Sequence, residues 1–140
     1  MSVELKYTEA IPHIMTLTFK GSWTIGELDS AMTRVLRAKS VSRVTHLVFN
    51  MEQTRFMPNG MLVYLRRILR VMPDQNCEIV IAGDDPSVLE FVELFRTVFE
   101  SQSVRVSWFN ALQTAITYVH PPNNMLFMPL QQGTAFSFQS

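Results

Sequence analysis

The stretch that decides the fold runs from His46 to Leu69, HLVFNMEQTRFMPNGMLVYLRRIL. It opens with the apolar run His46 to Phe49, which lacks polar alternation and therefore predicts a central strand buried on both faces. A short polar loop follows, and Asn59-Gly60 then opens an apolar helix, with Asn59 expected as its cap. A strand that leads through a short loop into a helix starts a strand-helix-strand unit, which predicts an α/β protein.

Alternating residues before this stretch predict an initial pair of strands. Val3-Leu5-Tyr7 and Met15-Leu17-Phe19 alternate with polar residues, and the connection around Ile11-Pro12 is too short for a crossover, so the two strands should form a hairpin. Thr24-Ile25-Gly26-Glu27 has the spacing of a capping box and predicts a helix that ends at about Lys39.

The elements after this stretch repeat the same unit. They are a buried strand at Ile79 to Ala82, a helix from Pro86 to about Phe99 capped by Asp85, an edge strand at Val104 to Trp108, and a helix from Ala111 to about His120 capped by Asn110. The predicted order is therefore ββαβαβαβα, in a mixed and mostly parallel sheet.

The length predicts one domain over residues 1–120, followed by a tail over residues 121–140 that Pro121-Pro122 separates from the last helix. The tail contains Met125 to Leu130 and then Phe136 and Phe138, whereas disordered segments are usually poor in large apolar residues. We expect an extended segment that docks on a groove or sheet edge. A loose terminus is the alternative, since termini fray unless they are held.

Composition excludes several classes of function. Lys plus Arg and Asp plus Glu both number 12, so there is no net charge to attract nucleic acid or an anionic membrane. No secretory signal pattern or 18-residue apolar run occurs, which predicts no membrane insertion. The single cysteine, Cys77, lies in an apolar run and is expected to be a buried core thiol, which suits a cytoplasmic protein.

The residues show no catalytic or metal-binding pattern. No nucleophile motif, phosphate-binding loop or dinucleotide fingerprint occurs, and His13, His46 and His120 lack metal-ligand spacing. His46 is expected to be a hydrogen-bonded, partly buried histidine. Asp84-Asp85 could provide acid and base groups, but Asp85 before Pro86 is better explained as a helix cap. We therefore expect no enzyme activity and no cofactor.

Four features of the sequence occur together: the element order, the strand ending LVFN, the Phe56-Met57 step and the Asn59-Gly60 helix start. In this combination the chain resembles the STAS domain family, typified by bacterial anti-sigma factor antagonists. The resemblance covers about residues 3–120. It implies a signalling module that binds protein partners, and family members typically carry Asp-Ser-Ser-Gly at this helix start, where a kinase phosphorylates a serine. Here Met57, Pro58 and Asn59 occupy the aspartate and serine positions, so the acceptor hydroxyl is missing.

The same resemblance extends to serine-lacking relatives described as SpoIIAA-like, and it implies an alternative function, the binding of a small apolar, lipid-like ligand by a carrier or sensor. Nine methionines and ten phenylalanines could line such a site.

The helix after Asn59 carries more apolar residues than one face needs. Leu62, Leu65, Leu69 and Met72 form one apolar face, and Val63, Arg66, Arg67 and Arg70 form a stripe opposite to it. Either neighbouring helices cover the excess, or it is exposed and marks a partner or homodimer interface. The predicted partner-binding residues are Met57, Pro58, Asn59, Gly60, Met61, Tyr64 and Ile68.

Overall fold

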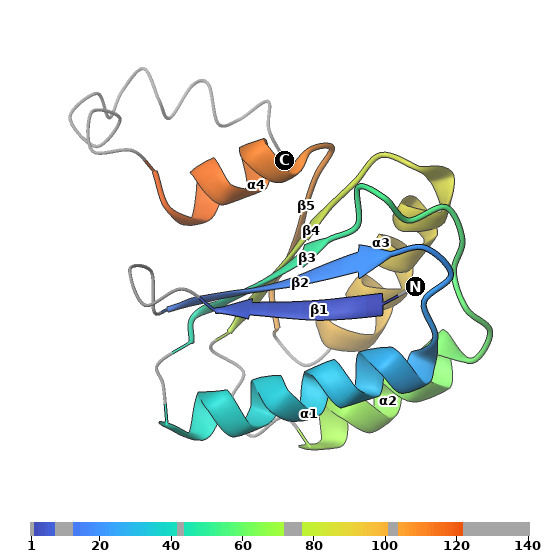
Figure 1. Cartoon of the computed structure of the whole chain (residues 1–140), viewed down its shortest axis with the longest axis horizontal. Coiled ribbons are helices and arrows are strands. Elements are labelled where there is room, and N and C mark those ends of the chain that lie inside the picture. The colour runs from blue at the N-terminus through green and yellow to red at the C-terminus, as the bar shows by residue number, and fades with distance from the viewer. Residues whose placement is uncertain (1, 8–12, 42–43, 72–76, 101–103, 122–140) are drawn as a thin grey trace.

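The computed structural model describes residues 2–7, 13–41, 44–71, 77–100 and 104–121. Its elements, in chain order, are β1 (Ser2–Tyr7), β2 (Ile14–Lys20), α1 (Ile25–Val41), β3 (His46–Asn50), α2 (Met61–Val71), β4 (Glu78–Ala82), α3 (Pro86–Phe99), β5 (Val106–Phe109) and α4 (Leu112–Val119) (Figure 1). This confirms the predicted α/β class and the predicted order of elements.

The strands form one mixed sheet in the order β1-β2-β3-β4-β5. β1 pairs antiparallel with β2, as expected of a hairpin, and the other neighbouring strands pair in parallel. Ile14 of β2 lies beside His46 of β3, which lies beside Glu78 of β4. β5 lies at the edge, as its alternating pattern predicted. The hairpin turn and the tail after Pro121 fall outside the described residues, so the docking expectation for the tail stays a prediction.

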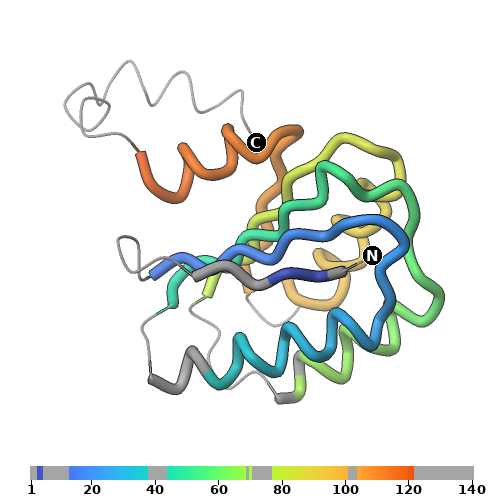
Figure 2. Tube along the Cα trace, in the orientation of Figure 1, coloured from blue at the N-terminus to red at the C-terminus, as the bar shows by residue number. Residues whose placement is uncertain are grey.

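The helices divide unequally between the two faces of the sheet. α1, α2 and α3 cover one face, and α4 lies alone on the other (Figures 1 and 2). Successive residues of β3 serve the two faces in turn: Leu47 and Phe49 join the large core beneath α1, α2 and α3, while Val48 joins a smaller core beneath α4. This double burial explains why His46 to Phe49 is apolar throughout.

Two of the predicted helix caps are present. Thr24 and Glu27 form the reciprocal pair of a capping box: the Thr24 N–H donates to Glu27 Oε1 at 3.0 Å, and the Glu27 N–H donates to Thr24 Oγ1 at 3.2 Å. Asp85 caps α3 by accepting from the Ser87 N–H at 3.1 Å. The Ser87 hydroxyl and the Ser87 N–H both donate to the Asp85 carboxylate, and these two hydrogen bonds lower the pKa of Asp85.

The predicted caps of the other two helices were wrong. Gly60 occupies the capping position of α2, because its carbonyl accepts from the Tyr64 N–H at 3.0 Å and its φ is +85°, so Asn59 lies one residue too early. α4 begins at Leu112, and its capping residue, Ala111, has no side-chain hydrogen bond. The Leu112 N–H instead donates to Glu52 Oε2 at 2.8 Å, so a distant carboxylate replaces the expected Asn110 cap.

Gly83 follows β4 and lies close against the backbone of Met51. Replacing Gly83 should therefore destabilise the fold. Its φ is +151°, and an added Cβ would lie 2.8 Å from the Met51 carbonyl oxygen. We expect Gly83→Ala to lower the free energy of unfolding by about 2 kcal/mol or more in urea titrations. Gly26→Ala is the control, because its Cβ would meet only Thr24 Oγ1 at 3.8 Å and alanine favours a helix. Equal stability of the two variants would contradict this prediction.

Candidate functional site

The predicted partner-binding residues separate into two groups in the structure. Met57 and Pro58 are half-buried, and Asn59 and Gly60 are exposed, in the loop between β3 and α2. Met61, Tyr64 and Ile68, by contrast, are at most 5% exposed and belong to the large core. Their assignment to a partner surface was therefore wrong.

The reason lies in the position of α2. It is the middle helix of its layer, with α1 on one side and α3 on the other, so a wide arc of its surface is covered. Tyr64 and Ile68 pack towards α1, where they share a cavity lining with Leu28 and Met32. Of the two alternatives that the sequence left open, the first therefore holds for these residues, because neighbouring helices cover the apolar excess.

The loop of residues 51–60 is attached to the elements around it. Met51 is buried, and its N–H donates to the Ala82 carbonyl at 2.8 Å at the end of β4. Glu52 caps α4, as described above. The Arg55 guanidinium donates to the carbonyls of Glu52 and Thr54 and lies 3.9 Å from Asp85, the cap of α3. The loop therefore presents its outer side chains from a fixed backbone.

Three large apolar side chains are exposed near this loop. They are Phe56 in the loop at 36% exposed, Val63 in the first turn of α2 at 73%, and Leu89 in the first turn of α3 at 44%. We call these three residues the apical patch. All three lie where the parallel strands end and the helices begin, the region where α/β sheets bind ligands and partners. Phe56 packs against the buried Trp23, with ring centroids 5.9 Å apart.

The apical patch shares only its location with the predicted site. The sequence pattern indicated Met57 to Gly60 and gave no indication of Phe56 or Leu89. Val63 was placed on the outer stripe with the arginines, and its 73% exposure confirms that placement. A signal for Leu89 exists in the sequence: Val88, Phe91, Val92 and Phe95 complete the buried face of α3, which leaves Leu89 off that face.

A polar cluster lies at the opposite end of the sheet, beneath α4. Glu78 Oε2 accepts hydrogen bonds from the Ser107 hydroxyl at 2.5 Å and the Tyr118 hydroxyl at 2.8 Å. Glu78 Oε1 lies 3.5 Å from Nε2 of His46, and Nδ1 of His46 lies 2.9 Å from Thr45 Oγ1. This confirms His46 as a hydrogen-bonded, partly buried histidine.

The cluster fastens α4 to the sheet. The serine hydroxyl bonds to the carboxylate and not to the histidine, so the arrangement differs from the serine–histidine pair of a nucleophile. Tyr118 belongs to α4, whereas Glu78 and Ser107 belong to β4 and β5. Glu78 therefore ties the last turn of α4 to two strands, and Glu52 holds its first turn.

The ionisation of Glu78 predicts a pH-dependent stability. Burial raises its pKa, but hydrogen bonds from His46, Ser107 and Tyr118 outweigh burial and hold the pKa below its ordinary value. A carboxyl whose pKa is lower in the folded state stabilises the fold above the unfolded pKa of about 4.3, and this stabilisation disappears as the pH falls through the folded value.

We therefore expect Glu78→Gln to be less stable than the wild type at neutral pH. The difference in free energy of unfolding should shrink as the pH falls below about 4.3, because the wild-type carboxyl then also becomes neutral. Urea titrations of both proteins across that range measure it. A difference that stays constant down to the lowest pH would show that the charge of Glu78 contributes nothing.

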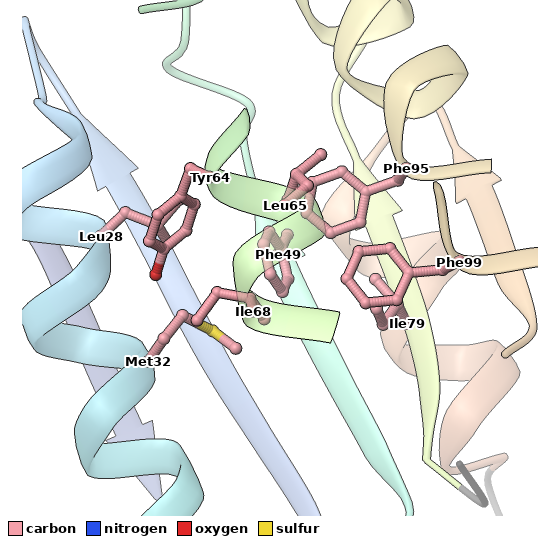
Figure 3. Close-up of a pocket in the computed structure, with 9 residues that line it drawn as sticks. All are labelled: Leu28, Met32, Phe49, Tyr64, Leu65, Ile68, Ile79, Phe95 and Phe99. Carbon is pink, nitrogen blue, oxygen red and sulfur yellow. The ribbon is translucent and has the colours of Figure 1, made fainter. Parts of the chain in front are cut away.

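One apolar cavity lies between the sheet and the layer of α1, α2 and α3 (Figure 3). Its volume is about 10 Å³, which is about the space that one water molecule requires. A small apolar ligand could enter only if the surrounding helices moved apart. Its lining residues are Leu28, Met32, Phe49, Tyr64, Leu65, Ile68, Ile79, Phe95 and Phe99.

The hydroxyl of Tyr64 is the polar group among the side chains that line this cavity. Burial raises its pKa, and the nearby Asp29 carboxylate adds to that rise. The two groups do not have hydrogen-bonding geometry, so the buried hydroxyl has no hydrogen-bond partner among the described residues. Arg67 lies 3.7 Å from Asp29 and stacks over the Tyr64 ring at 5.3 Å, so these three residues join α1 to α2.

Searches for metal sites and membrane spans gave no candidate in the described part of the chain. No group of three or more His, Cys, Asp or Glu residues within it could hold a metal ion. No helix within the described ranges has the length and hydropathy to cross a membrane. Cys77 is buried, as expected of a core thiol.

The comparisons with known proteins leave the chain without a family assignment. No family model matches its sequence, and a search of curated proteins finds no relative.

Proposed function

We propose that this chain is a non-catalytic, cytoplasmic interaction module of the STAS type, which binds a protein partner through the apical patch and does not use phosphorylation as a switch. The observation that carries the proposal is the apical patch itself. Single exposed apolar residues are common on protein surfaces, but these three share the end of the sheet where α/β proteins bind partners, which favours an interaction site.

The attachment of the loop supports the same proposal. A surface that is already ordered loses little conformational entropy when a partner binds, so a fixed loop favours affinity. Glu52 ties the loop to α4, and Arg55 donates to the loop carbonyl of Thr54, whereas the Phe56 ring is 36% exposed. The resemblance of the helix start to STAS domains and the ββαβαβαβα order of elements support the proposal.

A ligand carrier is the weaker candidate. The cavity beneath α2 has suitable apolar walls, but its volume of about 10 Å³ is far below the several hundred Å³ typical of ligand pockets. The exposed apical patch needs no rearrangement to bind a partner, so we favour the interaction module.

Site-specific photocrosslinking tests the proposal. A photoreactive phenylalanine analogue would replace Phe56, Val63 or Leu89 in the full chain, in the cells that produce it. The controls carry the analogue at Arg105 or His120, which are exposed at the opposite end of the sheet, before β5 and after α4. We expect a discrete crosslinked species from the patch positions and none from the controls. Equal crosslinking from both sets, or none from the patch, would contradict the proposal.

The absence of a phosphorylation switch is a separate prediction. No serine or threonine occurs between Phe56 and Met61, and the nearest hydroxyl, that of Thr54, is buried. A kinase needs an accessible hydroxyl, so the loop should remain unmodified. Intact-mass measurement and peptide mapping of protein purified from its own cells would test this. A phosphate found within residues 51–61 would restore the switch and overturn the prediction.

A further inference from the structure

The outer surfaces of α2 and α3 carry opposite charges. α2 contains Arg66, Arg67 and Arg70, all exposed, and no acidic residue. α3 carries Glu90 and Glu93, and Glu100 is the residue at its C-terminal cap. All three glutamates are exposed, and Arg96 is the single basic residue of this helix. The zero net charge of the chain therefore conceals a separation of charge between neighbouring helices of one layer.

The two helices are adjacent, and the charges lie at comparable heights along them. Leu65 and Ile68 of α2 line the same cavity as Phe95 and Phe99 of α3, and Leu65 lies beside Phe95 (Figure 3). Four exposed charged residues lie within two positions of these cavity residues in sequence, and we therefore place them at comparable levels on the outer surface: Arg66 and Arg70 on α2, and Glu93 and Glu100 on α3. Arg67 differs from the other two arginines, since it already pairs with Asp29 of α1.

We propose that a second copy of this chain docks on this surface, as the partner that the proposed function requires. A twofold axis that runs between α2 and α3, parallel to both, places α2 of each copy over α3 of the other and keeps their directions. Arg66 and Arg70 of one copy then face glutamates of its mate, and each such contact occurs twice. The interface closes on itself as a dimer.

The apical patch fits this arrangement. Val63 and Leu89 lie in the first turns of α2 and α3, so the same rotation brings Val63 of one copy towards Leu89 of the other. Their exposed apolar surfaces would be buried beside the charged pairs. Interfaces commonly combine an apolar contact with surrounding charges, which select the partner and set the register.

A second copy fits this surface better than a partner of a single charge. An acidic protein, a nucleic acid or an anionic membrane would be attracted by the arginines of α2 but repelled by the glutamates of α3. A basic partner would meet the reverse problem. A partner avoids the repulsion only if it places acidic residues opposite α2 and basic residues opposite α3. A second copy of this chain provides that pattern.

Charge reversal tests the arrangement with sedimentation of the full chain at low ionic strength. The first variant is R66E/R70E, which makes both helix surfaces acidic, and the second is E93R/E100R, which makes both basic. Each variant alone should self-associate at least about tenfold more weakly than the wild type, because like charges face each other twice. An equimolar mixture of the two variants should dimerise again, since every helix pair is then complementary.

Two controls accompany the test. K20E/R105E reverses two charges on the other face of the sheet and should leave self-association unchanged. Lys20 is half-buried with a side chain that is 43% exposed, and the other replaced residues are exposed, so the melting temperatures of the variants should stay close to that of the wild type. Wild-type association should also weaken in about 1 M salt, where the Debye length falls to about 3 Å.

The contrary outcomes are distinct. A wild-type chain that stays monomeric at low ionic strength would overturn the dimer, as would variants that remain dimeric or a mixture that stays monomeric. Crosslinks from the apical patch to a different protein, with a monomeric chain, would also overturn the dimer while the proposed interaction function stands. A dimer whose patch positions give no crosslink would instead contradict the proposed use of the patch.

Discussion

Replacing Ile68 with aspartate is expected to cost about 4 kcal/mol or more of the free energy of unfolding, which is a large fraction of the stability of a domain. Ile68 is 5% exposed, and it lies in the large core with Tyr64 and Leu65 of its own helix and Met32 of α1. An aspartate there would bury a charge without a partner. Circular dichroism and urea titration of the variant would measure the loss.

The matched control lies on the other side of the same helix. Val63 is 73% exposed, so Val63→Asp should change the free energy of unfolding by no more than about 0.5 kcal/mol. The same variant should weaken association through the apical patch, because it places a charge among apolar contacts. If Ile68→Asp instead remained fully folded and lost only self-association, Ile68 would be an interface residue and the core packing described here would be wrong.

Replacing Phe91 with alanine should produce the second large loss, about 4 kcal/mol. The Phe91 ring lies at the centre of an aromatic group in the large core. Its centroid is 4.7 Å from that of Phe95, 5.9 Å from Trp23, 6.2 Å from Phe19 and 6.3 Å from Phe49. Alanine would remove contacts with four aromatic side chains at once and leave a cavity that the surrounding strands and helices cannot fill.

Leu89→Ala is the control for Phe91→Ala, because Leu89 lies on the same helix and is 44% exposed. Its stability should lie within about 1 kcal/mol of the wild type in the same urea titration, since little buried surface is removed. If the two variants lost similar free energies of unfolding, the Phe91 face of α3 would not be more buried than the Leu89 face, which would contradict the structure.

The local patterns of the sequence were sufficient for the elements and their order. The unbroken apolar run at His46 to Phe49 predicted a strand buried on both faces, and Val48 does face a different core from Leu47 and Phe49. The capping box at Thr24 and the Asp85 cap were readable because both join residues within one turn of chain. The exposure of Val63 and the partial burial of His46 were also predicted correctly.

The local patterns could not predict contacts between residues that are far apart in the sequence. Asn110 looked like the cap of α4, but Glu52 supplies it across 60 residues, and only the meeting of two strand ends brings them together. The cluster around Glu78 combines residues from three strands and a helix, so no spacing in the sequence announces it.

The misassigned face of α2 has the same origin. A periodic pattern gives the direction of an apolar stripe but not its required width, because the width depends on how many neighbours a helix has. The sequence by itself therefore determined the α/β class, the order of elements and two of the four helix caps, which depend on residues a few positions apart. The tertiary structure decided that Met61, Tyr64 and Ile68 are buried and that Phe56, Val63 and Leu89 are exposed, because α2 lies between α1 and α3.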